Sequence, residues 1–469
     1  MSLRPRSNTY PQSTSLHRLS IAYAMYSYPA GRMPRDVWED IFLHCLPVPS
    51  MQHCTTSTAP LLLLQVCRAW RRVALSLPHL WTSLSVAVRN GQASPPLNVA
   101  SEWLQRSGDL PLQLSLSQSN ESDGNQEAAD AVLALYMRYL RRWKDVRLDV
   151  ANPTYGKSLQ PSAHLYAPLL ETFHLLTLHR MTPNDEIMQD LLRMLEVAPR
   201  LSNFSVTRLS DLDVSPTTTV AIPWTQLTCL DLGFIPSVSA CLSLMSGCPK
   251  LESCNLLVDE NQGPLPAVPI VLPALTSIEL HIRSTELAAL LDRAIFPALK
   301  SMVLYVQNAD DSQVFWPQTS FMDFLGRSKC TLTRLNVYDT GVLPSQFIEC
   351  LEHESVRGIT ELVVHDNRDW TWDPIITPKL VKLLTVDGGE ILLPSLRKLD
   401  LGRGCWTCPD GLLSDMIESR WRTKKAGVAR LEHVHVDMHL LWDTNGPDRK
   451  KLQRLRQEGM KVRIGFYHD

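Results

Sequence analysis

A short apolar motif recurs along most of this chain. Its pattern is apolar-x-x-apolar-x-apolar, and four consecutive copies, starting at Leu227, Leu251, Leu275 and Leu299, lie 24 residues apart. In an extended strand, the last two apolar residues of the motif face the same side. One such unit cannot cover its apolar side by itself, so successive units must stack and share one core.

Eleven copies of the motif follow one another at spacings of 24 to 37 residues. They begin at Trp143, Leu170, Leu201, Leu227, Leu251, Leu275, Leu299, Leu332, Ile359, Leu396 and Leu431. Helix-like runs such as Val238–Met245 and Leu412–Trp421 lie between them. The pattern predicts an α/β repeat fold, a solenoid with a curved parallel sheet and helices on its convex side. The alternative is an ordinary α/β domain with chance alternation, and the regular spacing argues against it.

The residue between the last two apolar positions of each copy is predicted to point away from the core, toward the open face of the sheet. These residues are Arg147, His174, Ser205, Asp231, Asn255, Glu279, Val303, Asn336, Val363, Asp400 and His435. Candidate substrate-binding positions are the larger polar ones, namely Arg147, His174, Asp231, Asn255, Glu279, Asn336, Asp400 and His435. Three carboxylates against one permanent cation favour a partner that presents Lys or Arg. A merely solvated face is the alternative.

The N-terminal part of the chain has a different sequence pattern from the repeats. Residues 1–32 are rich in Ser, Arg, Pro and Tyr without an apolar period, and we expect them to form a mobile tail. A short helix is predicted from Met33-Pro34, and a second one follows a polar loop and begins at Pro60. The pattern predicts a small helical domain over residues 33–90 and the solenoid over residues 100–469.

Two stretches of this segment resemble an F-box. Met33-Pro34-Arg35-Asp36-Val37-Trp38-Glu39-Asp40-Ile41-Phe42 is similar to its opening helix, although Met33, Asp36 and Trp38 replace the usual Leu, Glu and Leu. Val66-Cys67-Arg68-Ala69-Trp70-Arg71, with Pro78-His79-Leu80-Trp81, resembles its second half. In the F-box-like proteins numerous in mushroom-forming fungi, such a box is commonly followed by irregular leucine-rich repeats.

The resemblance implies docking on a Skp-family adaptor of a cullin complex, with a protein substrate held by the repeats. The implied adaptor-binding residues are Pro34, Val37, Ile41, Phe42, Val66, Cys67, Trp70, Leu80 and Trp81. The chain would then be the substrate-recognition subunit of a ubiquitin ligase and not an enzyme. Two alternatives stay open: these residues can form the core of a small helical subdomain, and the repeats can serve as an interaction scaffold without a ligase role.

Composition argues against several other classes of protein. The formal net charge is −2, so no electrostatic footprint for nucleic acid or an anionic membrane is present. The longest aliphatic block, Leu61–Leu64, is far too short for a membrane span. The 11 cysteines have no framework spacing, which favours reduced thiols and a cytoplasmic or nuclear location.

No motif for phosphate cradling, nucleophilic hydrolysis or zinc proteolysis occurs, and no cofactor is expected. Cys405-Trp406-Thr407-Cys408 is a lone C-x-x-C without a second pair, so no metal site is predicted. His433 and His435 share one strand face and are interpreted as solvated. The basic run from Arg449 to Arg456 is predicted to be the wet face of a last helix, with Leu452 and Leu455 packed inward.

Overall fold

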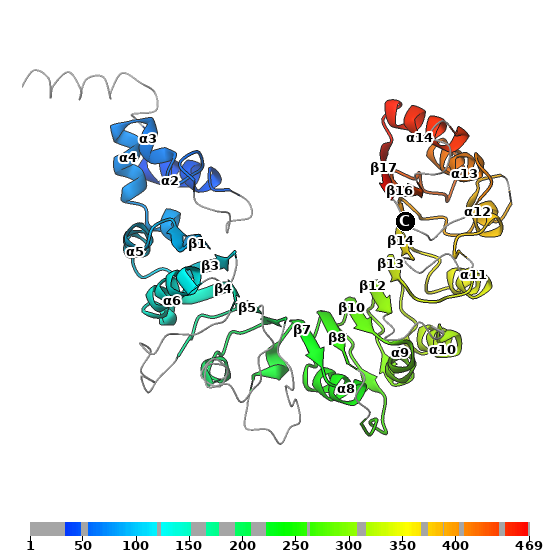
Figure 1. Ribbon diagram of the computed structural model, residues 1–469, viewed down its shortest axis with the longest axis horizontal. Coiled ribbons are helices and arrows are strands. Elements are labelled where there is room, and N and C mark those ends of the chain that lie inside the picture. Colours follow the sequence, from blue (N-terminus) through cyan, green and yellow to red (C-terminus); the bar gives the residue numbers. More distant parts are fainter. Residues whose placement is uncertain are drawn as a thin grey trace, which may run out of the picture. The chain divides into compact units, whose positions relative to one another are not determined.

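The computed structural model describes residues 33–47, 55–119, 123–151, 166–177, 193–207, 222–259, 263–306, 316–366, 374–387, 389–402, 408–439 and 446–467 (Figure 1). The chain divides into two compact units between Tyr136 and Met137. We call them unit 1 and unit 2. The predicted tail of residues 1–32 lies outside the described residues.

Unit 1 begins with helices. They are α2 (Arg35–His44), α3 (Leu63–Val66) and α4 (Arg68–Leu75), followed by the 3-10 turn η2 (Pro78–Trp81). Phe42 and Trp70 join α2 to α4, with ring centroids 5.1 Å apart, and Trp38 lies 5.5 Å from both rings. Trp81 is fully buried, and its indole N–H donates a 3.0 Å hydrogen bond to the Ala74 carbonyl. Aromatic packing therefore holds these short helices together.

The rest of unit 1 is a small α/β element. Its parts are β1 (Ser83–Arg89), β2 (Gln92–Ser94), α5 (Leu97–Arg106), β3 (Leu112–Gln118) and α6 (Asp123–Met137). Strand β1 pairs with β2 antiparallel and with β3 parallel. Asn90 and Gly91 both have positive φ, 52° and 71°, as a two-residue type I′ hairpin turn requires.

The predicted helical domain of residues 33–90 differs from the structure at its C-terminal end. Helical structure stops after Trp81, and Ser83–Arg89 is a strand with Leu84, Val86 and Val88 fully buried. The compact unit also extends to Tyr136, beyond the predicted boundary between residues 90 and 100. The reason is that β1 needs β3 and α5 to cover its buried side.

Unit 2 is built on one long parallel sheet. In sheet order its strands are β17 (Lys461–Tyr467), β16 (His433–His439), β15 (Lys398–Leu401), β14 (Glu361–His365), β13 (Arg334–Tyr338), β12 (Ser301–Val306), β10 (Ser277–Ile282), β8 (Ser253–Val258), β7 (Cys229–Ile235), β6 (Asn203–Val206), β5 (Thr172–Thr177) and β4 (Trp143–Val150). Each of the eleven predicted copies forms one strand, which confirms the strand positions. Strand β17 follows the last copy and was not predicted.

Helices connect most of these strands. They are α8 (Val238–Gly247), α9 (Ser284–Leu291), α10 (Gln318–Ser328), α11 (Pro344–Glu352), α12 (Pro378–Leu384), α13 (Leu412–Trp421) and α14 (Pro447–Gln457). Figure 1 shows them along the outer side of the curve that β7 to β17 describe within unit 2. Short elements complete the unit: η3 (Leu140–Arg142), η4 (Trp224–Gln226) and the paired β9 (Ile270–Val271) and β11 (Ala294–Ile295). Leu452 and Leu455 of α14 are fully buried, as predicted.

The core of unit 2 consists of apolar rows that run across the strands. Ile278, for example, is in register with Cys254 on one side and Met302 on the other. The second and third apolar residues of every copy are 4% exposed or less. Burying a Leu, Ile or Val side chain stabilises a fold by about 1.5–3 kcal/mol. Because each row spans many strands, the stacked units share one continuous core.

A fully buried charged side chain lies inside this core. Arg420 of α13 is 0% exposed, and its guanidinium donates to the carbonyls of Leu384, Leu392 and Leu393 at 2.5–3.0 Å. Burial lowers its pKa to about 10. Leu384 ends α12, and Leu392 and Leu393 lie in the connection to β15, so Arg420 donates to buried carbonyls of both and ties them together.

We predict that Arg420→Met lowers the free energy of unfolding of the chain by about 3 kcal/mol, because three buried carbonyls lose a charged donor. The free energy of unfolding of Arg420→Lys should lie between those of the wild type and Arg420→Met, because one ammonium cannot reach all three carbonyl acceptors. Urea unfolding measures the change. The control is Arg357→Met, an exposed arginine paired with Glu390, for which a change within about 0.5 kcal/mol is expected. Equal effects at both positions would contradict the assignment.

Candidate functional site

The predicted adaptor-binding residues fall into two groups in the structure. Phe42, Leu80 and Trp81 are buried at 1% exposure or less, so they form the core of the helical segment. Trp70 is half-buried between Trp38 and Phe42. The exposed members are Pro34, Val37, Ile41, Val66 and Cys67. Motif residues therefore supply both the core and an outer surface.

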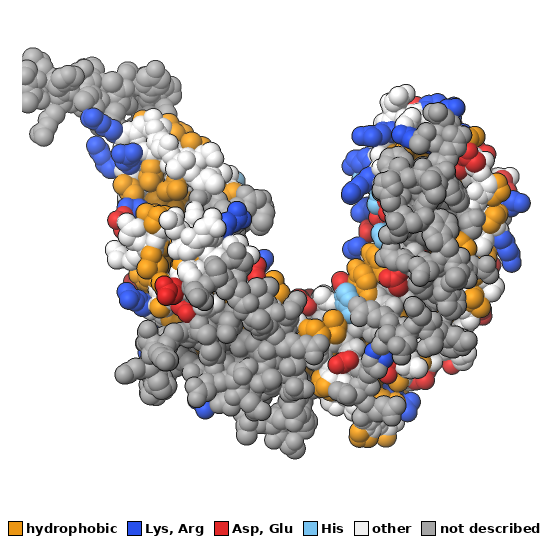
Figure 2. All heavy atoms as spheres, viewed as in Figure 1, with side chains coloured by type: hydrophobic (Ala, Val, Ile, Leu, Met, Phe, Trp, Pro, Cys, Tyr) orange, Lys and Arg blue, Asp and Glu red, His pale blue; other side chains and the backbone are white. Residues whose placement is uncertain are grey.

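That outer surface is apolar. Val37 and Ile41 lie four residues apart on α2 and are 39% and 37% exposed. Leu62 and Val66 lie four residues apart at α3, with 42% and 53% of their surface exposed. Figure 2 shows apolar side chains at the surface of this helical segment. Exposed aliphatic side chains at helical spacing are typical of a surface that a partner covers.

Cys67 has a local structural role. Both Cys67 and Cys45 are exposed. The Cys67 sulfur accepts a hydrogen bond from the Trp70 backbone N–H at 3.4 Å and so caps the first turn of α4. In the described part of the chain, no group of three His, Cys, Asp or Glu side chains could hold a metal ion. Cys405–Thr407 lies outside that part, and Cys408 is buried.

The predicted open-face residues of unit 2 form one line across the sheet. The strand register pairs Arg147 with His174 and continues through Ser205, Asp231, Asn255, Glu279, Val303, Asn336, Val363 and Asp400 to His435. We call this line the face row. Arg463 of β17 continues it beyond His435. The row is confirmed as an arrangement, whereas its binding role stays a prediction.

The side chains of the face row differ in how much of their surface is exposed to solvent. Arg147 and Arg463 at its two ends are exposed, and most of the polar members between them are half-buried. Val303 and Val363 are 8% and 6% exposed, and Asn336 is only 2% exposed. Asn336 was a predicted substrate-binding residue, and its burial corrects that prediction. Its in-register neighbours on β12 and β14 are Val303 and Val363, which are themselves nearly buried.

The carboxylates of the face row already have partners within the sheet. Asp231 accepts a 2.9 Å hydrogen bond from the Ser205 hydroxyl, and a Glu279 oxygen lies 3.3 Å from a His281 ring nitrogen. One Asp400 oxygen lies 2.8 Å from His365 Nε2 and 2.9 Å from His435 Nδ1. These carboxylates are therefore hydrogen-bonded within the sheet, and the preference for a Lys or Arg partner stays a prediction.

An aromatic ladder lies two residues beyond the face row on β10, β12, β13 and β14. His281 and Tyr305 stack with centroids 4.2 Å apart, and Tyr305 and Tyr338 stack at 4.1 Å. His365 meets Tyr338 edge-on at 5.0 Å. Burial raises the pKa of Tyr338, and Tyr305 raises it further, so the phenol stays neutral. Because the rings stack on one another, their edges and polar atoms are what remains for a ligand.

Gly402 makes the end of the ladder possible. It follows β15, and the His365 ring lies where a Cβ atom at this position would stand. The missing side chain lets the His365 ring lie close against β15, where its Nε2 reaches Asp400. His435 extends the network, since its second ring nitrogen lies 3.2 Å from an Asp437 oxygen. The result is a polar chain from β14 to β16.

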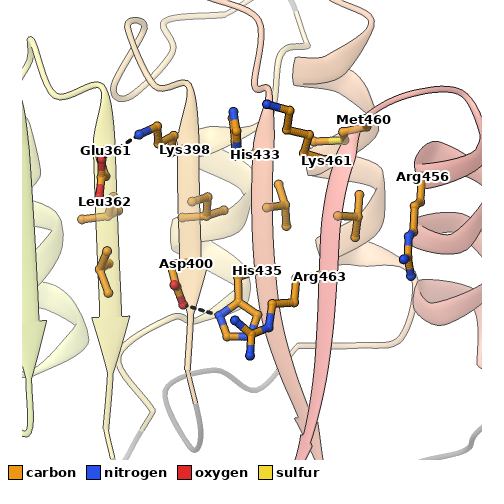
Figure 3. A pocket seen from close by; sticks show the side chains of 14 residues that line it. Glu361, Leu362, Lys398, Asp400, His433, His435, Arg456, Met460, Lys461 and Arg463 are labelled. Atoms are coloured by element: carbon orange, nitrogen blue, oxygen red, sulfur yellow. Dashed lines mark hydrogen bonds and ion pairs between the residues drawn. The ribbon is translucent and has the colours of Figure 1, made fainter. Parts of the chain in front are cut away.

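A cavity of about 370 Å³ opens beside the polar side chains of Asp400 and His435, on the face of β14 to β17 (Figure 3). Glu361, Lys398, His433 and Lys461 border it along one row, and Asp400, His435 and Arg463 along the next. Arg456 of α14 completes its rim beyond β17. Figure 2 shows Lys and Arg side chains gathered beside His at this end of unit 2. We call this cavity the basic pocket. The sequence reasoning missed Lys461 and Arg463, although the alternation Met460, Val462, Ile464 signals a strand.

We predict that Asp400 makes the stability of unit 2 depend on pH in the acid range. Burial raises its pKa, but the His365 hydrogen bond and the neighbouring His435 and His365 charges lower it, and the net shift is downward from 3.8. A lowered pKa stabilises the fold above pH 4 or so, and that contribution is lost as the pH falls further. Asp400→Asn should therefore cost about 1 kcal/mol at neutral pH and less below pH 4. Urea unfolding at both pH values checks this, and a constant difference would contradict it.

No protein-family model matches this chain, and no curated protein matches it by sequence. The resemblance to an F-box therefore rests on the motif residues between Met33 and Trp81. In the described part of the chain, no helix combines the length and the hydropathy that a bilayer crossing requires. The geometry shows an α/β chain with exposed apolar side chains on its N-terminal helices. Its strand–helix repeat carries the basic pocket on the open face of the sheet.

Proposed function

We propose that this chain is the substrate-recognition subunit of a cullin-type ubiquitin ligase. Its N-terminal helices would dock on a Skp-family adaptor, and the open face of the sheet in unit 2 would hold a protein substrate. The chain itself would carry out no chemical step. The single observation that carries this proposal is the exposure of Val37, Ile41 and Val66 in a segment whose motif resembles an F-box.

The exposure of these residues supports docking in a specific way. A helical segment that needed them only as a core would bury them, as it buries Phe42 and Trp81. These side chains are 37–53% exposed, so part of their apolar surface stays in water, and a partner that covers that part gains roughly 25 cal/mol for each Å² removed from water. The Trp38–Phe42–Trp70 cluster fixes α2 against α4, so the exposed residues stand on a preorganised surface.

The sheet face supports substrate capture. It presents polar side chains on consecutive parallel strands, in register, over a distance that a protein segment rather than a small molecule would span. The aromatic ladder and the basic pocket lie next to each other on this face. An extended row of this kind offers many weak contacts to one bound chain, which suits recognition of a protein.

We predict that Ile41→Asp together with Val66→Asp lowers co-purification of the full chain with a Skp-family adaptor at least about tenfold. Both side chains are exposed, so the charges cost the fold little while they oppose an apolar contact. Quantitative pull-down of the purified adaptor measures the loss. The matched control is Leu97→Asp, since Leu97 is 40% exposed on α5 outside the motif and should leave binding unchanged.

The outcomes separate this proposal from the alternative. If the wild-type chain never retains an adaptor, the alternative holds, namely a repeat scaffold without a ligase role. Equal loss in the Leu97→Asp variant would mean that the charge acts through folding, which the melting temperature of each variant reports. Binding that survives the double variant would place the adaptor contact elsewhere.

A further inference from the structure

The connection between β8 and β10 contains a proline-rich segment that the function proposed above does not use. Its sequence is Gly263-Pro264-Leu265-Pro266-Ala267-Val268-Pro269. Leu265 is 40% exposed, and Val268, at 72%, is the most exposed large aliphatic side chain in the described part of the chain. Ala267 and Pro269 are exposed as well. Apolar side chains that protrude together in this way are typical of a surface that contacts a partner.

Two hydrogen bonds hold the backbone of this segment. The Ser239 hydroxyl of α8 donates to the Pro264 carbonyl at 2.6 Å, and Nε of Arg293 donates to the Pro266 carbonyl at 3.0 Å. The segment then enters β9, which contacts α8 and pairs with β11. It therefore lies on the helix side of unit 2, where Figure 1 shows α8 and α9, and presents its side chains from an anchored backbone.

The order of aliphatic and proline residues indicates what kind of partner the segment fits. Leu265-Pro266 and Val268-Pro269 are two aliphatic–proline pairs, and they begin three residues apart. A polyproline II helix has three residues per turn and rises about 3.1 Å per residue. In that conformation both pairs project from the same face, about 9 Å apart. Segments with the pattern P-x-x-P dock in this conformation on grooves that aromatic side chains line.

The segment needs only a local change to reach that conformation. In the structure, its backbone bends at Ala267 and Val268. Proline fixes φ at positions 264, 266 and 269, and each proline also favours extended backbone in the residue before it. Ala267 is thus the one residue of the seven that no proline restricts. Most of the conformational entropy of ordering is already lost in the free chain, so straightening the segment costs little.

We propose that Leu265–Pro269 is the ligand of a proline-recognising domain of the SH3 type in a partner protein. The two aliphatic–proline pairs would lie against the aromatic side chains of its groove. The prolines have no backbone N–H that the groove would leave unpaired. This site goes beyond the proposed ligase role and does not depend on it. Because the segment lies on the helix side of unit 2, it can be bound while the open face of the sheet holds a substrate.

The test measures retention of the full-length chain on an immobilised array of purified SH3 domains. We expect one or more domains to retain the chain, and Val268→Asp with Pro269→Ala to lower that retention at least about tenfold. The matched control is Val197→Asp with Pro199→Ala, which makes the same two changes at an exposed valine and an exposed proline outside the segment. The control should leave retention unchanged. Ala267→Pro should raise retention, because it removes the remaining backbone freedom.

The other outcomes would overturn the proposal. They are an array on which no domain retains the chain, an equal loss in the control variant, and weaker retention of Ala267→Pro at an unchanged melting temperature. A synthetic peptide of residues 263–271 should compete with the chain, and this result does not depend on the folding of any variant. A dimer that Val268→Asp disperses in size-exclusion chromatography would instead place a second copy on the segment. Adaptor pull-down should be unchanged in every segment variant, so failure of this site and failure of adaptor docking are distinguishable.

Discussion

The structure of unit 2 depends on one requirement, that every strand buries an apolar side it cannot cover alone. Each copy places two apolar residues on the inner side of a strand, and the neighbouring strands supply the matching residues at the same height. The row through Ile278 and Met302 is stabilised by units that lie 24 residues away along the chain. Register is therefore set by burial, because a slip of one residue would turn every apolar side chain outward.

The same requirement arranges the open face of the sheet as a consequence. When the apolar residues align, the residues between them align as well, and side chains distant in sequence become neighbours. Asp400 meets His365 and His435 in this way, and the stacked rings from His281 to Tyr338 arise in the same way. The core supplies the free energy of folding, so polar residues can be placed on the outer row without loss of the fold.

In unit 1, different residues of the same helical segment form the core and the surface. Its first helices, α2, α3 and α4, have only 10, 4 and 8 residues, and tryptophans add large apolar surfaces; the Trp81 and Trp103 ring centroids, for example, lie 4.8 Å apart. With the core supplied by Phe42, Leu80 and Trp81, the aliphatic residues of α2 and α3 remain at the surface. One motif can thus serve both a core and a contact surface, which reconciles the two interpretations of its residues.

Local sequence alone determined where eleven strands of unit 2 lie and which of their residues share a face, because alternation with a period of two is a property of the chain itself. It also determined the buried face of α14. The strands β1, β2 and β3 were missed, although Asn90-Gly91 signals the hairpin between β1 and β2. The tertiary structure decided the rest: the burial of Asn336 and Arg420, the stacking of the ladder, and the gathering of Lys461, Arg463 and Arg456. These depend on contacts across neighbouring strands and helices, and only the folded register states which side chains face one another.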